Sequence, residues 1–99
     1  MDAIFCGSDQ IARGVADGLR SAGRQVPGDV ALVGFDNWKP MADGADPPLT
    51  SIDMNLEQIG RLAAEYLFSA IDGEPAHGIR TVPPRLIVRE STVGNRLTK

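Results

Sequence analysis

The chain has 99 residues, of which 42% are hydrophobic and 23% charged, and its formal net charge is −3. This composition excludes a disordered chain, and the length suits one small domain. The Lys and Arg residues are scattered, which excludes the basic stripe that binds DNA phosphates. No stretch approaches the roughly 18 apolar residues of a membrane span, and no signal-peptide pattern is present, so we expect a cytoplasmic protein.

The first third of the chain is predicted to form a strand–helix–strand unit. The apolar run at residues 3–6 predicts a buried strand, and apolar residues at three-to-four spacing predict a helix over 10–22. Ser8 or Asp9 can cap this helix. Residues 30–35 are apolar on both faces, which is typical of a strand in a buried parallel sheet. The expected buried stripe of the helix is Ala12, Val15, Ala16, Leu19 and Ala22.

The second half of the chain continues this alternation after a loop. Residues 36–48, which hold Asn37, Gly44 and three Pro residues, predict the loop, and residues 49–52 predict a further strand. A helix is expected over 55–72, and a last strand within 84–90. Residues 93–99 are expected to be a frayed tail.

The second helix carries its own start and stop signals. Asn55 is a candidate cap, and Gln58 three residues later fits a capping box. Gly73 is expected to end the helix in a left-handed conformation. The expected buried stripe is Leu56, Ile59, Ala63, Leu67, Ala70 and Ile71.

The sequence offers little for catalysis or metal binding. His77 is the one histidine and is expected to be a surface residue, while Cys6 is the one cysteine and is expected to be buried and structural. We therefore expect no enzyme activity, no cofactor and no metal. An alternative is a receiver-like or hydrolytic α/β domain with a Mg²⁺ site built from Asp2, Asp9 and Asp36.

Two strands end in polar residues, and this pattern favours a binding site. In a doubly wound sheet, ligands bind beyond the carboxyl ends of the strands. Asp36, Asn37 and Trp38 follow the strand at 30–35 and combine a carboxylate, an amide and an aromatic face, which suit a sugar. The alternative is that Asp36 and Asn37 only form a turn while Trp38 covers the core.

An ordered series of short motifs resembles the C-terminal half of the effector-binding domain in LacI/GalR transcriptional regulators. The series covers roughly nine-tenths of the chain. It consists of residues 5–10 (FCGSDQ), 26–37 (VPGDVALVGFDN), 47–52 (PPLTSI), 60–64 (GRLAA) and 84–92 (PRLIVREST). The resemblance implies an α/β fold, a parallel-sheet βαβ part of a periplasmic-binding-protein-like (type I) domain. It also implies two lobes with an effector between them.

The resemblance assigns roles to individual residues. Asp36 matches an aspartate that accepts hydrogen bonds from effector hydroxyls, and Ser8 lines the same cleft. Met54 lies on a crossover to the other lobe, where a polar residue often reaches the ligand. The implied ligand-binding residues are Asp36, Ser8, Asn37, Trp38 and Met54.

The resemblance also implies a homodimer and a domain layout. Residues 1–92 would be the C-terminal part of the effector domain, with the helix at 55–72 contributed to the other lobe. The loop 41–46 is expected to assist pairing. The implied dimer-interface residues are Ile11, Arg13, Gly14 and Asp17.

The implied partners are operator DNA and a small-molecule effector, for which a sugar is the expected class. The DNA would be bound through a helix-turn-helix head that this chain does not contain. The main alternative with the same architecture is a periplasmic sugar-binding protein of a transport system. The ending at residues 85–92 favours the regulator.

Overall fold

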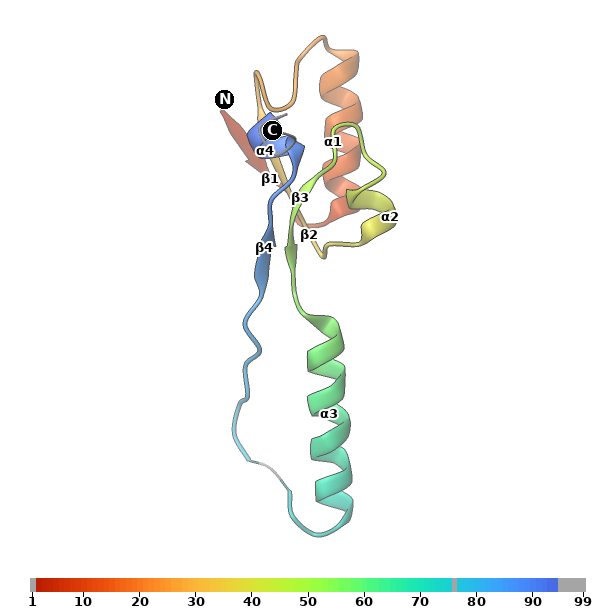
Figure 1. Ribbon diagram of the computed structural model, residues 1–99, viewed down its shortest axis with the longest axis vertical. Coiled ribbons are helices and arrows are strands. Elements are labelled where there is room, and N and C mark those ends of the chain that lie inside the picture. Colours follow the sequence, from red (N-terminus) through yellow and green to blue (C-terminus); the bar gives the residue numbers. More distant parts are fainter. Residues whose placement is uncertain (1, 76, 95–99) are drawn as a thin grey trace. The chain divides into compact units, whose positions relative to one another are not determined.

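The computed structural model describes residues 2–75 and 77–94, which divide into two units. The first unit holds residues 2–53 and 86–94, and the second holds Met54–Arg85. The helices and strands, labelled in Figure 1, are β1 Ala3–Phe5, α1 Asp9–Ser21, β2 Ala31–Phe35, α2 Lys39–Ala42, β3 Thr50–Asp53, α3 Leu56–Ile71, β4 Arg85–Ile87 and α4 Glu90–Val93. None of the described helices is long and apolar enough to cross a membrane.

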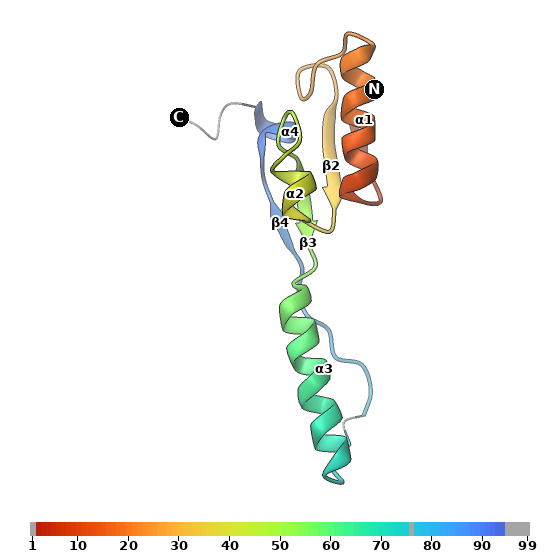
Figure 2. The same ribbon diagram turned by 90° about the vertical axis from the view of Figure 1, so that its right-hand side faces the viewer.

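The first unit is built on a sheet with the strand order β1-β2-β3-β4. The β1–β2 and β2–β3 pairs are parallel, with Phe5 opposite Val33 and Phe35 opposite Ile52. Helix α1 connects β1 to β2 and lies alongside β2 (Figure 2). The predicted α/β class and the predicted βαβ unit are therefore confirmed. The carboxyl ends of β1, β2 and β3 meet at one edge of the sheet.

Short-range signals explain where α1 begins and ends. The Ser8 hydroxyl caps the helix by accepting a hydrogen bond from the amide of Ile11 at 3.1 Å. The chain leaves the helix through Gly23, whose φ of 76° is a conformation that glycine adopts without strain. Of the two predicted candidates, Ser8 is therefore the cap. Asp9 is instead the first residue of the helix, and its side chain has other partners.

The core of the first unit lies between α1, α2 and the sheet. Ala12 and Ala16 of α1 pack on Leu32 of β2, and all three are buried. Val15 and Leu19 are only partly buried and Ala22 is exposed, so the predicted stripe was too wide at its C-terminal end. The full core cluster is Cys6, Ala12, Ala16, Leu32, Ala42, Ala45 and Leu49.

Three segments differ from the sequence prediction. The expected loop 36–48 contains the short helix α2, whose residue Ala42 is buried in the core. The last strand is shorter than expected, with β4 covering three residues of the predicted 84–90. Val93, the first residue of the expected frayed tail, is the last residue of α4, a helix whose Ser91 is fully buried. Residues 95–99 of the expected tail lie outside the described residues. Tertiary packing orders these short segments, which carry no periodic pattern.

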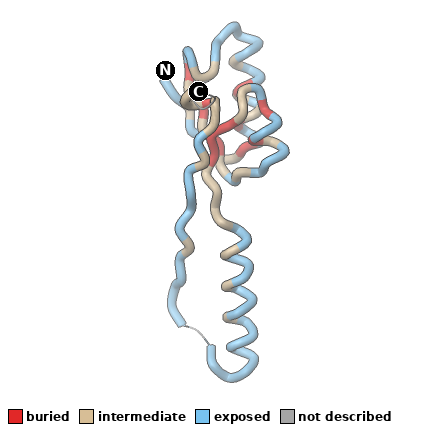
Figure 3. Tube along the Cα trace, in the orientation of Figure 1, coloured by how far each residue is buried: buried red, intermediate tan, exposed pale blue. Residues whose placement is uncertain are grey.

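The second unit consists mainly of α3 and the segment that follows it. No residue of α3 is buried (Figure 3), which contradicts the predicted buried stripe. Ile71, for example, is 70% exposed. One helix and one extended segment are too thin to bury a side chain between them. Asn55 adopts a left-handed conformation (φ 59°) and makes no side-chain cap, so the predicted capping box does not form. Gly73, with φ 89°, follows the helix as predicted.

Candidate functional site

The predicted ligand-binding residues of the first unit lie on two loops at the carboxyl edge of the sheet. Ser8 follows β1, and Asp36, Asn37 and Trp38 follow β2. We refer to residues 36–38 as the β2 tip. In open α/β sheets this edge is where ligands bind. Met54 comes one residue after β3 and belongs to the second unit.

The backbone of the β2 tip has an unusual conformation. Asp36 and Asn37 have φ values of 108° and 51°, in a region that non-glycine residues rarely adopt. Such conformations cost roughly 1–3 kcal/mol each and persist where surrounding bonds enforce them. Here the three successive amides of the tip all donate hydrogen bonds, to the Ile52 carbonyl, the Ser51 hydroxyl and an Asp9 carboxylate oxygen. The protein's own hydrogen bonds therefore hold the tip in one shape.

Asp9 is the buried anchor of the β2 tip. Its side chain is fully enclosed, with a residue exposure of 1%. One carboxylate oxygen accepts from the Trp38 amide at 2.7 Å, and the other accepts from the Ser51 hydroxyl at 2.6 Å. Gly34 makes room for it, because a Cβ at that position would collide with the Asp9 carboxylate. Asp9 thus has a structural role that sequence reasoning missed.

The Asn37 side chain is bonded on both sides. Its oxygen accepts from the Arg89 guanidinium at 2.7 Å, and its nitrogen donates to the Asp53 carboxylate at 3.2 Å. The positive partner faces the oxygen and the negative partner faces the nitrogen, so the orientation of the amide is electrostatically defined. One N–H and one oxygen lone pair of the amide remain for a ligand.

Asp36 and Trp38 present open side chains at the same edge. Asp36 is exposed, and among the described residues no group donates a hydrogen bond to its carboxylate. Trp38 is 50% exposed. Trp38 thus does not cover the core, whereas the Asn37 side chain is bonded within the protein, and the choice between a binding site and a simple turn stays a prediction. The hydroxyl of Ser8 caps α1 through its oxygen, and its hydrogen can still be donated.

The predicted dimer residues lie on α1. Ile11 is 56% exposed, and a Cβ at Gly14 would meet no atom within 4 Å. Arg13 contacts the Met41 sulfur at 3.7 Å, which joins α1 to α2. Asp17 forms an exposed ion pair with Arg20 at 3.0 Å.

The described residues form no group of three or more His, Cys, Asp or Glu side chains that could hold a metal ion. The Mg²⁺ site considered as an alternative would use the Asp9 carboxylate as a ligand. Both oxygens of that carboxylate instead accept hydrogen bonds from protein groups.

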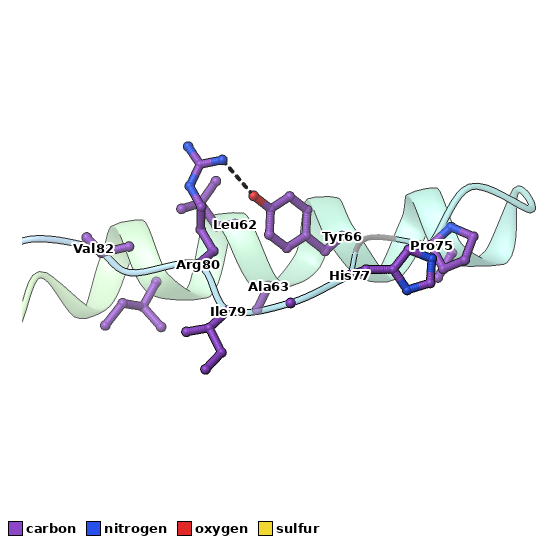
Figure 4. Close-up of a pocket in the computed structure, with 11 residues that line it drawn as sticks. Leu62, Ala63, Tyr66, Pro75, His77, Ile79, Arg80 and Val82 are labelled. Atoms are coloured by element: carbon purple, nitrogen blue, oxygen red, sulfur yellow. Dashed lines mark hydrogen bonds between the residues drawn. The ribbon is translucent and has the colours of Figure 1, made fainter.

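The second unit contains a groove of about 570 Å³ beside α3 (Figure 4). Leu62 and Tyr66 of the helix lie beside Arg80 of the following segment, and the Arg80 guanidinium donates to the Tyr66 hydroxyl at 2.9 Å. His77 lines the groove and is exposed, in agreement with its predicted surface position.

Comparison with known proteins covers nearly the whole chain. A family model described as "periplasmic binding protein-like domain" matches residues 1–92. The HTH-type transcriptional regulator CelR of Thermobifida fusca is 41% identical over 92% of this chain and 27% of its own length. The HTH-type transcriptional regulator MalR of Streptomyces coelicolor is 40% identical over 91% of this chain and 26% of its own length. The chain thus spans about a quarter of the curated relatives it matches.

Solved structures show the same likeness. A complex of the transcriptional regulator CelR with cellobiose has a TM-score of 0.82 at 41% identity, over 92% of this chain and 28% of that one. The lac repressor dimer bound to operator and the anti-inducer ONPF has a TM-score of 0.85 at 26% identity, over 92% of this chain and 32% of that one. The resemblance to LacI/GalR regulators is confirmed.

Proposed function

Because the chain belongs to the periplasmic binding protein-like domain family, we propose that it supplies the C-terminal part of an effector-binding domain in a sugar-responsive transcriptional regulator. Its role is binding rather than covalent chemistry, in a cytoplasmic protein that holds operator DNA through a separate helix-turn-helix head. The open carboxylate of Asp36 on a rigid β2 tip is the observation that carries this proposal.

The β2 tip provides the groups that a sugar requires. The Asp36 carboxylate accepts hydrogen bonds from adjacent hydroxyls, and the exposed indole of Trp38 packs against the apolar C–H face of the ring. The free N–H of Asn37 and the Ser8 hydroxyl supply further polar contacts. Met54 is a further proposed contact, which rests on the resemblance alone. The CelR–cellobiose complex makes cellobiose the first effector to test.

Regulation then follows from linkage between two sites. An effector shifts an equilibrium only if it binds one arrangement better than the other. We propose that the effector bridges the β2 tip and the other lobe, so that it favours the closed arrangement. Closure changes the spacing of two DNA-binding heads in a dimer and hence the affinity for operator.

The test compares two Asp→Asn substitutions in the full-length protein. Asp36→Asn removes the charge at the β2 tip, and Asp2→Asn makes the same change at the amino end of β1. Titration calorimetry with cellobiose, with ribose, for which a similar operon repressor is named, and with ONPG, which the lac repressor binds, measures effector affinity. Fluorescence anisotropy measures binding to the DNA upstream of the gene. We expect Asp36→Asn to weaken the best sugar by about 10- to 100-fold while DNA binding persists. Equal sugar affinity in both variants would refute the role of Asp36.

We also propose that two copies pair through the exposed face of α1, assisted by residues 41–46, which comprise the end of α2 and the loop after it. The exposed Ile11 and the open surface at Gly14 support this, as does the likeness to the lac repressor dimer. Ile11→Asp should shift the full-length protein toward monomer in sedimentation velocity, because a buried unpaired charge is costly. Gln10→Asp places the same charge one residue away, on another side of the helix, and serves as the control. A dimer of unchanged strength in the Ile11 variant would contradict this interface.

A further inference from the structure

Arg89, between β4 and α4, contacts the connection from β2 to β3 at three separate points. Its guanidinium donates to the Asn37 side-chain oxygen at 2.7 Å and to the Leu49 carbonyl at 2.8 Å, and its Nε pairs with the Asp43 carboxylate at 2.8 Å. The side chain is only 13% exposed. Its backbone is fixed as well, because the Arg89 amide donates to the Thr50 hydroxyl at 2.8 Å.

This arrangement requires the shape of an arginine. Guanidinium nitrogens lie in one plane and direct their hydrogens to different sides, so that one group can serve three acceptors at fixed angles. A lysine keeps the charge, but its single ammonium on a flexible stem cannot reproduce the same fork. The acceptors lie 40 and 52 residues away at Leu49 and Asn37. One side chain therefore fixes both ends of a long connection.

The bond to Asn37 has a direct consequence for the β2 tip. Because Arg89 faces the Asn37 oxygen, that oxygen points away from Asp53 and the amide N–H₂ points toward it. Without Arg89, the amide can turn over or leave its place, and residue 37 loses a restraint on its positive φ. The direction of the adjacent Asp36 would then depend on the backbone hydrogen bonds of the tip alone.

We infer that Arg89 is a positioning residue for effector binding, which acts through Asn37 and does not touch the effector itself. The inference rests on the proposed sugar-binding function of the β2 tip. It also gives the contact between Arg89 and Asp43 a role, because the same guanidinium then links the β2 tip to the end of α2.

The experiment uses Arg89→Lys in the full-length protein, alone and combined with Asn37→Ala. Arg61→Lys is the matched control, because Arg61 makes an exposed ion pair with Glu57 on α3, outside the first unit. Hydrogen exchange of the amides of residues 36–38, read by mass spectrometry without any sugar, reports the shape of the tip. Calorimetric titration with cellobiose, ribose and ONPG reports effector affinity.

We expect Arg89→Lys to speed exchange at residues 36–38 severalfold and to weaken the sugar about tenfold, because charge-assisted hydrogen bonds are lost. In the Asn37→Ala background the same substitution should change sugar affinity less than twofold, since its route is already cut. A uniform rise in exchange across α1 as well would indicate general destabilisation and overturn the inference.

The two proposals fail differently. If the unmodified protein binds none of the three sugars, the proposed effector class is wrong. The positioning role of Arg89 is tested separately, because unchanged hydrogen exchange at residues 36–38 in Arg89→Lys would overturn it whether or not a sugar binds. If sugar binds and Arg89→Lys weakens it equally in both Asn37 backgrounds, Arg89 does not act through Asn37. Should a harsher variant such as Arg89→Gln fail to fold, the lysine variant retains the charge and keeps the test available.

Discussion

Removing the Asp9 carboxylate should destabilise the domain far more than removing a surface carboxylate. In Asp9→Ala the Trp38 amide and the Ser51 hydroxyl lose their acceptor. Each of these two donors left without a partner costs about 1–3 kcal/mol, so the free energy of unfolding should fall by about 2–6 kcal/mol. The positive-φ backbone of the β2 tip also loses its anchor, and sugar affinity should fall with it.

Thermal unfolding of the full-length protein, followed by scanning calorimetry, measures this effect. A loss of that size corresponds to a decrease in Tm of about 10 °C. Asp9→Asn retains one oxygen acceptor and should lose roughly half as much. Glu65→Ala, on the exposed surface of α3, should change the free energy by less than about 0.5 kcal/mol. If Asp9→Ala were as stable as Glu65→Ala, the anchoring role of Asp9 would be wrong.

Three further predictions concern the same region. Gly34→Ala forces a methyl group against the Asp9 carboxylate and should cost about 1–3 kcal/mol in thermal unfolding; an unchanged Tm would show that the strand yields. Ser51→Ala removes the acceptor of the Asn37 amide and should lower the free energy of unfolding by a similar amount. Its effect should be less than additive with that of Asp9→Ala, because Ser51 and Asp9 share a hydrogen bond, and full additivity would argue against one network. Burial raises the pKa of the Cys6 thiol, so iodoacetamide at neutral pH should modify Cys6 in the unfolded but not in the native protein. Peptide mass spectrometry measures this modification, and equal rates in the two states would contradict the burial of Cys6.

Signals that act over a few residues were readable from the sequence. The strand before Ser8, the cap of α1 and the left-handed Gly23 all depend on neighbours in the chain. The apolar run of β2 and the polar residues after it placed Asp36, Asn37 and Trp38 at one edge, because parallel strands share their carboxyl ends. The assignment of these residues to a ligand stays a prediction, as does the contribution of residues 55–72 to another lobe.

Only the tertiary structure showed which polar residues hold the β2 tip in place and which side chains are exposed on it. Asp9 bonds to groups 29 and 42 residues away, and Arg89 reaches Asn37 across 52, so no local pattern distinguishes them from surface charges. For α3 the sequence predicted the helix correctly but not its burial. Its periodicity correctly predicted a helix, but burial depends on a surface that packs against the stripe, and such a surface is a property of the folded arrangement rather than of the helix.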